Sequence, residues 1–366
     1  MATYKRQRYL FMTLDPVHIG TGGYRLGRVD NSIVREPGTK IPKIPGTSLH
    51  GAARSYAAQL YETPEAAGQD QKGITNPETN PVCYTFGYLN SGDGDNPSDS
   101  NQTKPKKKEV AYSGVVNIFD AHVLLFPVHS MVGAVWVSTV ERLKEAGFTG
   151  LPDDWDDVST AVLTWDKPDK RLNLGWLMVN VADQKVEVKT PSKWQSGDRQ
   201  KALDQAIKKI VLIKDALFSQ IVNSNLEVRT SVAINPDTGA AEEGALFTYE
   251  AIPRATFLTA EVVLDDYRRE KEEWHLGKIK ETGKKKEDGT PKQLPGDAWS
   301  DPLDVVKAGF RMIEWLGVGG MGTRGFGRMA VVGEPTEVTL KNCWQGSETS
   351  SPTEQPTTTA DKGGNS

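Results

Sequence analysis

The sequence has few cysteines and no long run of apolar residues. Only Cys83 and Cys343 occur among its 366 residues, and they lie far apart. Two distant cysteines exclude a disulfide scaffold and a zinc site built from cysteines, and they indicate a reducing compartment. No apolar run approaches the length of a membrane span, and the N-terminal residues lack the apolar core of a signal peptide. The sequence therefore predicts a cytoplasmic protein with no membrane partner.

The composition is that of an ordinary globular protein, because 37% of the residues are hydrophobic and 25% are charged. A chain of this length can bury a sizeable core in one large domain or two modest ones. Two segments depart from this composition. Residues 265–300 are charged and rich in turn formers, which indicates an insertion, and residues 345–366 are rich in Ser, Thr, Pro and Gly, which predicts disorder.

Positive charge is concentrated near the N-terminus, although the whole chain has a net charge of −4. Residues 1–54 hold nine Lys or Arg against three acids, a local charge of +6, so the rest of the chain carries −10. A basic segment on an acidic protein indicates a specific groove for a polyanion rather than a general nucleic-acid coat.

This basic segment has the pattern of a strand, a loop and a helix. Residues 8–14 alternate in the way typical of a strand. The loop that follows is rich in glycine, which supplies backbone freedom. Thr47 or Ser48 can cap the free N–H groups of the helix that comes next. A helix start of this kind favours anions, and Arg54 lies two turns farther along.

Periodicity predicts the elements of the remaining chain. The clearest helix is expected over residues 201–222, and a long hairpin over residues 227–234 and 245–249. The other expected elements are strands at 115–128, 256–264 and 329–332 and helices at 138–147 and from Asp301 to Gly317. The succession of strand, helix, strands, helix and final strand fits a ferredoxin-like α+β fold.

Several segments, in a fixed order along the chain, resemble the RAMP proteins of type III CRISPR effectors. They are residues 18–22, Val29 and Asp30 with Arg35 and Glu36, residues 44–49 with Arg54, and the glycine-rich residues 317–328. Within these proteins the chain looks most like the repeated backbone subunit of the Cmr complex (type III-B). Residues 117–128 and 243–253 support that resemblance.

The resemblance extends to about residue 335 and implies one RAMP domain over residues 1–344. The implied fold is α+β, with a ferredoxin-like (RRM-like) palm and loop insertions. A β-hairpin thumb over about residues 226–255 would protrude from the palm, and the charged insertion would occupy about residues 265–300.

The resemblance also implies a function, that of a metal-dependent endoribonuclease within a ribonucleoprotein. Copies of the chain, together with other subunits of the type III complex, would bind a guide RNA and cleave complementary target RNA at regular intervals. Such a protein holds RNA without reading its sequence, so base pairing selects the target. Mg²⁺ or another divalent cation is the implied cofactor. Two alternatives stay open: a non-catalytic structural RAMP subunit and, more distantly, an endonuclease that processes guide precursors.

Asp30 is the predicted catalytic residue and metal ligand. Composition alone favours a simple turn aspartate at this position. Arg25, Arg28 and Arg35 would bring a phosphate chain close, however, and a carboxylate beside a phosphodiester is unfavourable unless it binds a hard cation or takes a proton. In matching family members the aspartate at this place is required for cutting target RNA. Whether Asp30 binds the metal or acts as a base stays open.

Three further residues are assigned to the catalytic site. His18 follows a predicted strand. It either anchors the glycine-rich loop after that strand through a backbone hydrogen bond or contacts phosphate and transfers a proton. Tyr249 and Glu250 lie at the base of the predicted hairpin. They either pack within an ordinary strand or support the cut phosphate.

The remaining assigned residues are predicted RNA contacts. In residues 317–328 the missing side chains would let an RNA backbone approach main-chain N–H groups, although a flexible connection is the simpler interpretation. The Gly-Lys-Ser/Thr ending of a nucleotide-binding P-loop is absent. His50 stands where the family commonly has a lysine, so Arg54 is the better phosphate contact of the two. The predicted RNA-binding residues are Arg25, Arg28, Arg35, Ser48, His50, Arg54, Gly319, Gly320, Gly322, Arg324, Gly325 and Arg328.

Overall fold

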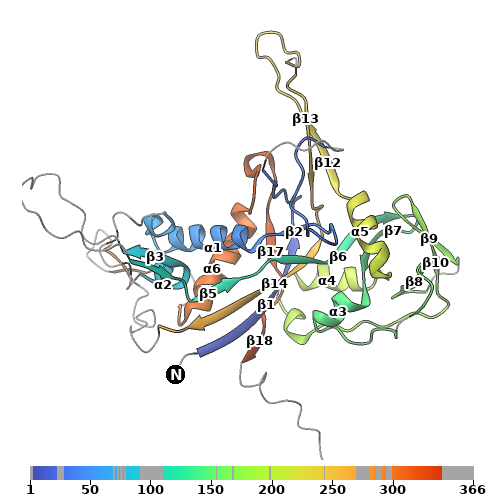
Figure 1. The fold of residues 1–366 in the computed structure, drawn as a ribbon, viewed down its shortest axis with the longest axis horizontal. Coiled ribbons are helices and arrows are strands. Elements are labelled where there is room, and N and C mark those ends of the chain that lie inside the picture. Colours follow the sequence, from blue (N-terminus) through green and yellow to red (C-terminus); the bar gives the residue numbers. More distant parts are fainter. Residues whose placement is uncertain are drawn as a thin grey trace, which may run out of the picture.

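A large mixed sheet runs through the molecule (Figure 1). The computed structural model describes residues 3–22, 29–68, 71, 74, 77, 80–90, 110–153, 155–166, 169–197, 199–242, 244–268, 281–285, 291–293 and 299–339. The tail predicted for residues 345–366 and most of the insertion predicted for residues 265–300 lie outside this part. Among the described residues no helix is both long and apolar enough to cross a bilayer.

Four adjacent strands form one half of the twelve-stranded sheet. In spatial order they are β17 (Met329–Val331), β1 (Thr3–Thr13), β14 (Phe257–Asp266) and β6 (Ala121–Ser130), and each pairs antiparallel with the next. Successive side chains of a strand point to opposite faces. Tyr9 and Phe11 accordingly enter one apolar cluster, while Leu10 and Met12 enter another. The sheet therefore has a core on both faces.

The sheet continues from β6 through shorter strands. In spatial order these are β7 (Gly133–Ser138), β11 (Ile210–Leu212), β8 (Thr160–Leu163), β10 (Leu177–Val181) and β9 (Arg171–Leu174). Three strands pair beside this path, namely β18 (Thr336–Thr339) with β1, β2 (Lys43–Ile44) with β6, and β5 (Val116–Ile118) with β14. Separate pairs are formed by β3 (Gly87–Asn90) with β4 (Val110–Ser113) and by β15 (Glu281–Lys285) with β16 (Pro291–Gln293).

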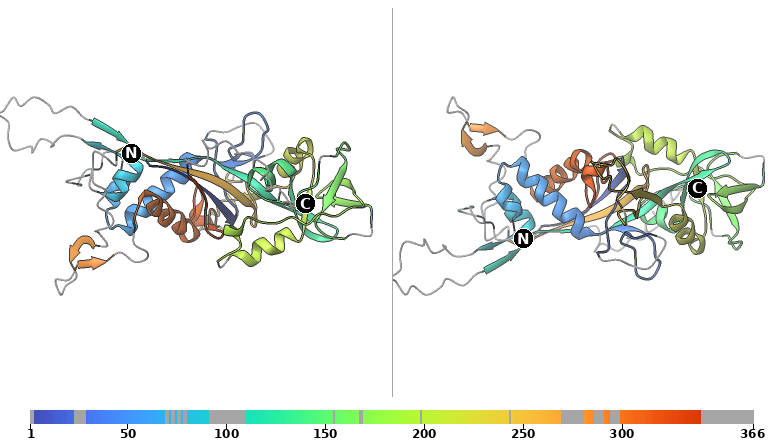
Figure 2. Two further views of the ribbon diagram at one scale, coloured as in Figure 1. Left: turned by 90° about the horizontal axis from the view of Figure 1, so that it is seen from below. Right: turned by 90° about the horizontal axis from the view of Figure 1, so that it is seen from above.

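The helices cover both faces of the sheet. The α-helices are α1 (Gly46–Leu60), α2 (Pro81–Phe86), α3 (Val140–Glu145), α4 (Gln200–Ile207), α5 (Asp215–Ser224) and α6 (Pro302–Leu316). Short 3₁₀ turns occur at η1 (Pro64–Ala67), η3 (Ser192–Trp194) and η5 (Gly322–Arg324). Helices α1 and α6 lie side by side (Figures 1 and 2) and pack on the face of β1 that carries Tyr9 and Phe11. Phe310 of α6 makes edge contacts with both rings, at 5.1 and 5.2 Å between centroids.

The predicted start and end of α6 are confirmed. Asp301 accepts hydrogen bonds from the amides of Leu303 and Asp304, and the Asp304 carboxylate accepts one from the Asp301 amide, which completes a capping box. Gly317 ends the helix with a φ of 79°. Both signals are local in sequence, which is why the pattern alone predicted them.

The predicted cap of α1 is wrong. Neither Thr47 nor Ser48 caps the helix, which begins at Gly46. The Gly46 amide instead donates to Oδ1 of Asp120 at 2.7 Å, and Lys43 pairs with Oδ2 of the same carboxylate at 2.6 Å. These contacts hold the pKa of Asp120 below its usual range despite the opposing effect of burial. A carboxylate from a distant segment thus occupies the anion site expected at this helix start.

The long helix predicted over residues 201–222 is also wrong. The structure has α4, strand β11 and α5 there. All three residues of β11 are buried, and the strand pairs parallel with β7 and antiparallel with β8. Ile210, Val211 and Leu212 fit a strand that is buried on both faces, and sheet pairing at this position overrides the helical spacing.

Close packing of α1 on α6 depends on Gly309. A Cβ atom added there would lie 2.4 Å from the carbonyl oxygen of Ala53. We expect Gly309→Ala to lower the free energy of unfolding by about 1–3 kcal/mol, because the two helices must separate. Gly51→Ala, on the exposed face of α1 with no atom within 4 Å of its Cβ position, should raise it by about 0.5–1 kcal/mol. Urea unfolding of both variants measures the difference, and equal midpoints would contradict the packing argument.

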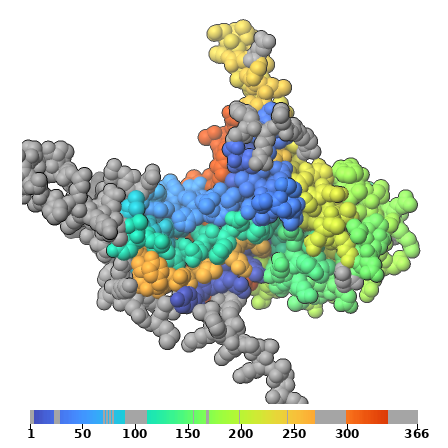
Figure 3. Space-filling view, in the orientation of Figure 1, coloured from blue at the N-terminus to red at the C-terminus, as the bar shows by residue number. Residues whose placement is uncertain are grey.

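A hairpin of β12 (Glu227–Ser231) and β13 (Phe247–Ala251) projects from the body (Figures 1 and 3). The predicted pair of strands around a turn is thus present. Beyond the ladder the chain is mostly exposed, including the apolar side chains of Val232, Ile234 and Leu246. The hairpin tip therefore adds little to the core of the protein.

Candidate functional site

Three parts of the chain meet at the base of the β12–β13 hairpin: residues 15–22 with 29–35, strand β13, and the glycine loop (residues 317–328). Residue Asn31 bridges to β13, with hydrogen bonds of 3.0 Å to the Thr248 carbonyl and 3.2 Å from the Glu250 amide. The glycine loop joins the same place through Gly320, whose amide donates to the His18 carbonyl at 3.0 Å. Tertiary structure thus gathers the predicted catalytic residues at one place.

Asp30 lies exposed on this base and is held by a single residue of β13. Its Oδ2 atom accepts hydrogen bonds from the Thr248 amide at 2.7 Å and from the Thr248 hydroxyl at 2.9 Å. The Asp30 amide in turn donates to that hydroxyl at 3.1 Å. The bond from the Thr248 amide, followed by that from its hydroxyl, lowers the pKa of Asp30. The carboxylate is therefore charged at neutral pH.

The chemistry of Asp30 fits a cation ligand better than a base. A carboxylate whose pKa lies below its ordinary range is a weak proton acceptor at neutral pH. It remains a suitable oxygen ligand for a hard cation. No group of three His, Cys, Asp or Glu that could hold a metal occurs in the described part of the chain. A cation at Asp30 would therefore take its other ligands from water or from phosphate oxygens, as Mg²⁺ commonly does.

Glu250 and Arg35 form an internal ion pair. Oε1 of the buried Glu250 accepts from Nη1 of Arg35 at 2.6 Å and from the Ile33 amide at 2.9 Å. The Nε atom of Arg35 donates to Asn223 of α5 at 2.8 Å. These bonds hold residues 30–35 against β13, and this structural task is what the geometry shows for both residues. Their roles in catalysis and RNA binding stay predictions.

His18 is buried between β13 and the glycine loop. Its Nδ1 atom lies 2.7 Å from the Glu250 carbonyl oxygen. Its own carbonyl accepts from Gly320, and a Cβ atom at Gly319 would come within 2.6 Å of that oxygen. The φ of Gly319 is also +86°, a conformation that favours glycine. The geometry matches the anchoring interpretation of His18, with β13 as the partner of its ring.

Tyr249 packs into a small aromatic cluster that joins the hairpin to the glycine loop. Its ring meets Phe326 at 5.4 Å and Phe247 at 5.8 Å between centroids. Arg324 lies over Phe247 at 5.2 Å, and Arg229 lies over Phe326 at 4.7 Å. Phe326 and Arg229 were not predicted as site residues, because no local signal links Phe326 to the hairpin or Arg229, on β12, to the glycine loop.

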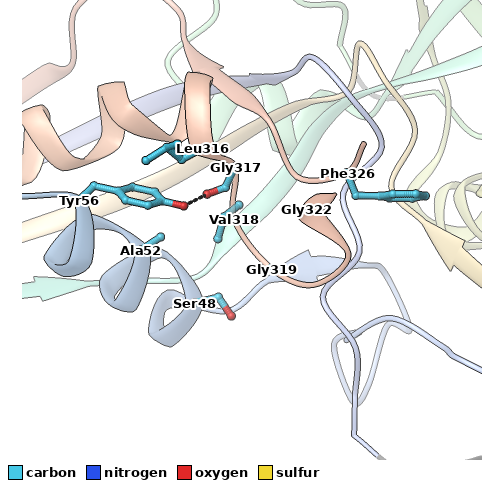
Figure 4. Close-up of a pocket in the computed structure, with 9 residues that line it drawn as sticks. All are labelled: Ser48, Ala52, Tyr56, Leu316, Gly317, Val318, Gly319, Gly322 and Phe326. Carbon is cyan, nitrogen blue, oxygen red and sulfur yellow. Dashed lines mark hydrogen bonds between the residues drawn. The ribbon is translucent and has the colours of Figure 1, made fainter. Parts of the chain in front are cut away.

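A pocket of about 300 Å³ lies between α1 and the glycine loop (Figure 4). The hydroxyl of Tyr56 closes one side by donating to the Gly317 carbonyl at 2.6 Å. Of the predicted RNA contacts, Ser48, Gly319 and Gly322 line it. No atom lies within 4 Å of a Cβ position at Gly322, so packing of the fold does not require a glycine there. The missing side chain instead leaves space at the pocket.

The structure does not bring His50 or Arg54 to this pocket. The Arg54 guanidinium donates to the Ala66 carbonyl at 2.8 and 3.0 Å, and burial lowers its pKa. The ring of His50 packs edge-on against Phe86 at 5.1 Å. Burial, and then the charge of Arg54, lowers the pKa of His50. The neutral ring supplies no charge for a phosphate, and Arg54 is already committed to a carbonyl.

The other predicted RNA contacts differ in how available the structure leaves them to a phosphate group. Arg328 is paired with Asp15 through its Nε atom at 2.5 Å, and this bond raises its pKa. Arg324 is exposed and forms no ion pair with any residue that the structure describes. Gly325 is exposed with a φ of +81°. Arg25 and Arg28 lie outside the described residues.

Comparison with known proteins identifies related sequences. The pattern of the RAMP superfamily matches residues 10–330. The chain is 26% identical over 256 residues to the CRISPR system Cmr endoribonuclease Cmr4 of Pyrococcus furiosus, covering 67% of this chain and 76% of that protein.

A solved structure with a TM-score above 0.5 shares the mixed α/β fold with a large sheet. A cryo-EM structure of type III-B Cmr-beta bound to cognate target RNA aligns with a TM-score of 0.52 and 14% identity, over 89% of this chain and 96% of that chain. A crystal structure of oligomeric Cmr4 from Pyrococcus furiosus aligns with a TM-score of 0.48 and 17% identity, over 92% and 99% of the two chains. At 14% identity, the similarity to the Cmr-beta structure concerns the fold alone.

Proposed function

Because the chain belongs to the RAMP superfamily, we propose that it is a backbone subunit of a type III CRISPR ribonucleoprotein working in the cytoplasm. In this role it binds a guide RNA beside further copies of itself and other subunits. It cleaves complementary target RNA at regular intervals in a metal-dependent reaction. The observation that carries the proposal is Asp30, an exposed carboxylate kept charged at the foot of a projecting hairpin.

A ferredoxin-like palm with a thumb is the architecture proposed for this subunit. The spatial order β17, β1, β14, β6 with antiparallel neighbours supports this architecture. The order along the chain supports it too, because α1 comes between β1 and β6 and α6 comes between β14 and β17. The β12–β13 hairpin would be the thumb. Its exposed apolar tip fits a wedge that enters between stacked bases.

Guide RNA is assigned to the groove between α1 and the glycine loop. Gly322 leaves main chain exposed at the pocket, and Ser48 offers a hydroxyl. Arg324 adds a charge that no described carboxylate neutralises. Contacts of this kind hold phosphate and sugar without reading bases.

Target RNA is assigned to the side of the hairpin base that carries Asp30. The Asp30 side chain is exposed, so its carboxylate is available to a divalent cation, Mg²⁺ or a similar ion. When bound, that cation supplies charge stabilisation at the phosphate. Asp30 itself gives its charge and position. The adjacent 2′-OH of the target loses its proton to water and attacks the phosphorus, and the bond from phosphorus to the 5′ oxygen breaks. The leaving oxygen takes a proton from water, so the products are a cyclic phosphate and a 5′-OH.

The rival function is that of a non-catalytic structural RAMP subunit. It is favoured by the contacts of His18, Glu250 and Tyr249, each of which holds segments together at the hairpin base. The experiment that separates the two functions replaces Asp30 with asparagine and measures target cleavage and target binding in the same purified complex.

We expect Arg324→Gln to weaken binding of RNA and to reduce the slope of log K against log salt by about one phosphate contact, about 0.7–0.9. The effect should be equal for unrelated RNA sequences, because phosphate contacts carry no sequence information. Arg171→Gln on β9, at the opposite end of the sheet, is the matched control. Salt-titrated binding measures both variants, and an unchanged slope for Arg324→Gln would remove this arginine from the groove.

A further inference from the structure

Two hydrogen bonds from Thr248, one from its amide and one from its hydroxyl, hold the carboxylate of Asp30. We propose that Thr248 is a positioning residue for target cleavage: its hydroxyl and amide fix the Asp30 carboxylate on the hairpin strand in the orientation that the reaction needs. This inference rests on the proposed function and adds a residue to it.

The hydroxyl of Thr248 is used twice. It accepts from the Asp30 amide at 3.1 Å and donates to Oδ2 of the same residue at 2.9 Å. With the bond from the Thr248 amide to Oδ2 at 2.7 Å, three contacts fix both the main chain and the side chain of Asp30. Oδ2 is thereby held on β13, while the side chain stays exposed to a ligand.

Strand geometry explains why Thr248 does this rather than its neighbours. Side chains alternate along a strand, so residues 248 and 250 share one face while Tyr249 points to the other. Tyr249 enters the aromatic cluster. Thr248 bonds Asp30, and Glu250 bonds Ile33 and Arg35. Residues 30–35 are therefore hydrogen-bonded along one face of β13.

This arrangement ties the cleavage site to the hairpin. Thr248 lies on β13, the strand that returns from the hairpin tip, and β12 pairs with it residue by residue. A displacement of the hairpin by RNA would move Thr248 and, through three hydrogen bonds, Asp30. The tip of the hairpin and the carboxylate of Asp30 would then keep a constant separation along the target RNA.

The test replaces Thr248 by valine in the assembled complex, which keeps the shape and removes the hydroxyl. We expect the single-turnover cleavage rate to fall by roughly 10–100-fold, as for other groups that orient a reactive ligand, with the Kd for target unchanged. Thr248→Ser restores the hydroxyl and should return the rate to within about threefold of wild type.

The chain offers a matched control in Thr230, the exposed cross-strand partner of Thr248 on β12. Thr230→Val should leave cleavage unchanged. Hydrogen exchange gives a readout that does not depend on activity: the Asp30 amide should exchange faster in Thr248→Val but not in Thr230→Val. The Asn31 amide, which donates to the Thr248 carbonyl, should stay protected in both.

The outcomes separate this inference from the proposed function. A wild-type cleavage rate in Thr248→Val, a loss of target binding equal to the loss of cleavage, or failure of serine to restore the rate would each overturn the positioning role. If Asp30→Asn abolishes cleavage in the same preparation, the proposed function stands without Thr248. If Asp30→Asn cleaves normally, the proposed function itself fails.

Discussion

Asp30→Asn should abolish cleavage of target RNA while leaving guide and target binding unchanged. The asparagine side chain keeps the shape of aspartate, and its oxygen still accepts the hydrogen bond from the backbone N–H of Thr248. It lacks the negative charge that attracts a hard cation. Because the side chain is exposed on the hairpin base, the substitution should not disturb the core. Denaturing gels of cleavage products and filter binding of the same complex measure the two properties.

Asp157→Asn is the matched control for this substitution. Asp157 is also an exposed aspartate whose pKa is lowered by hydrogen bonds, here from the hydroxyls of Thr160 and Ser159 and the amide of Ser159. It lies in the turn before β8, away from the hairpin base. Loss of cleavage in both variants would indicate a general effect of removing charge, and full activity in Asp30→Asn would exclude Asp30 as the catalytic residue.

Metal removal distinguishes the two roles that Asp30 could have. If it holds a cation, EDTA should abolish cutting, whereas if it acts as a base, the rate should persist, reduced, without metal. Both roles need the charged carboxylate. Because its pKa is lowered, cleavage should be lost only as the pH falls below the ordinary range of aspartate. A target with one 2′-deoxy nucleotide should resist cleavage at that linkage alone, because the attacking hydroxyl is missing.

Deletion of residues 235–243 from the hairpin tip should leave a folded protein that cleaves target poorly or without regular spacing. The described residues of this segment, 235–242, are almost all exposed, so the unfolding midpoint should change little. The β12–β13 ladder, and with it the contact of Thr248 to Asp30, remains. A product ladder identical to that of wild type would show that the tip is not the wedge.

A milder change tests the wedge without shortening the chain. Ile234→Ser and Leu246→Ser together remove the apolar surface, since these side chains are 55% and 66% exposed. These two side chains flank the segment that the deletion removes. Stacked bases are separated by apolar or aromatic side chains, so the double variant should also cleave target poorly or without regular spacing. Thr238→Ala, at the exposed turn of the same tip, serves as the control.

Some parts of the fold could be predicted because their signals are local. Alternation over residues 8–14 indicated β1, and Asp301 with Asp304 at one end and Gly317 at the other delimited α6. The hairpin at β12 and β13 followed from two short strand patterns around an Asn-Pro-Asp-Thr-Gly turn. In each case the residues that form the element also carry the information that specifies it.

Other parts depended on partners far away in the sequence. Residues 210–212 have an apolar pattern that suits a helix as well as a strand, and pairing with β7 and β8 decided for a strand. The cap of α1 is Asp120, and no motif near residue 46 indicates it. Arg54 looked free to bind phosphate, but the carbonyl of Ala66 on η1 holds it.

The sequence by itself determined the family resemblance, the main strands and helices of the α1–α6 half, and the prediction of Asp30 as the catalytic residue. Only the tertiary structure decided what Asp30 is joined to. Thr248 is 218 positions away along the chain and has no sequence pattern of its own, yet folding brings its hydroxyl within 2.9 Å of the carboxylate. Hydrogen bonds of this length depend on the spatial register of β13 and residues 30–35, which local patterns do not encode.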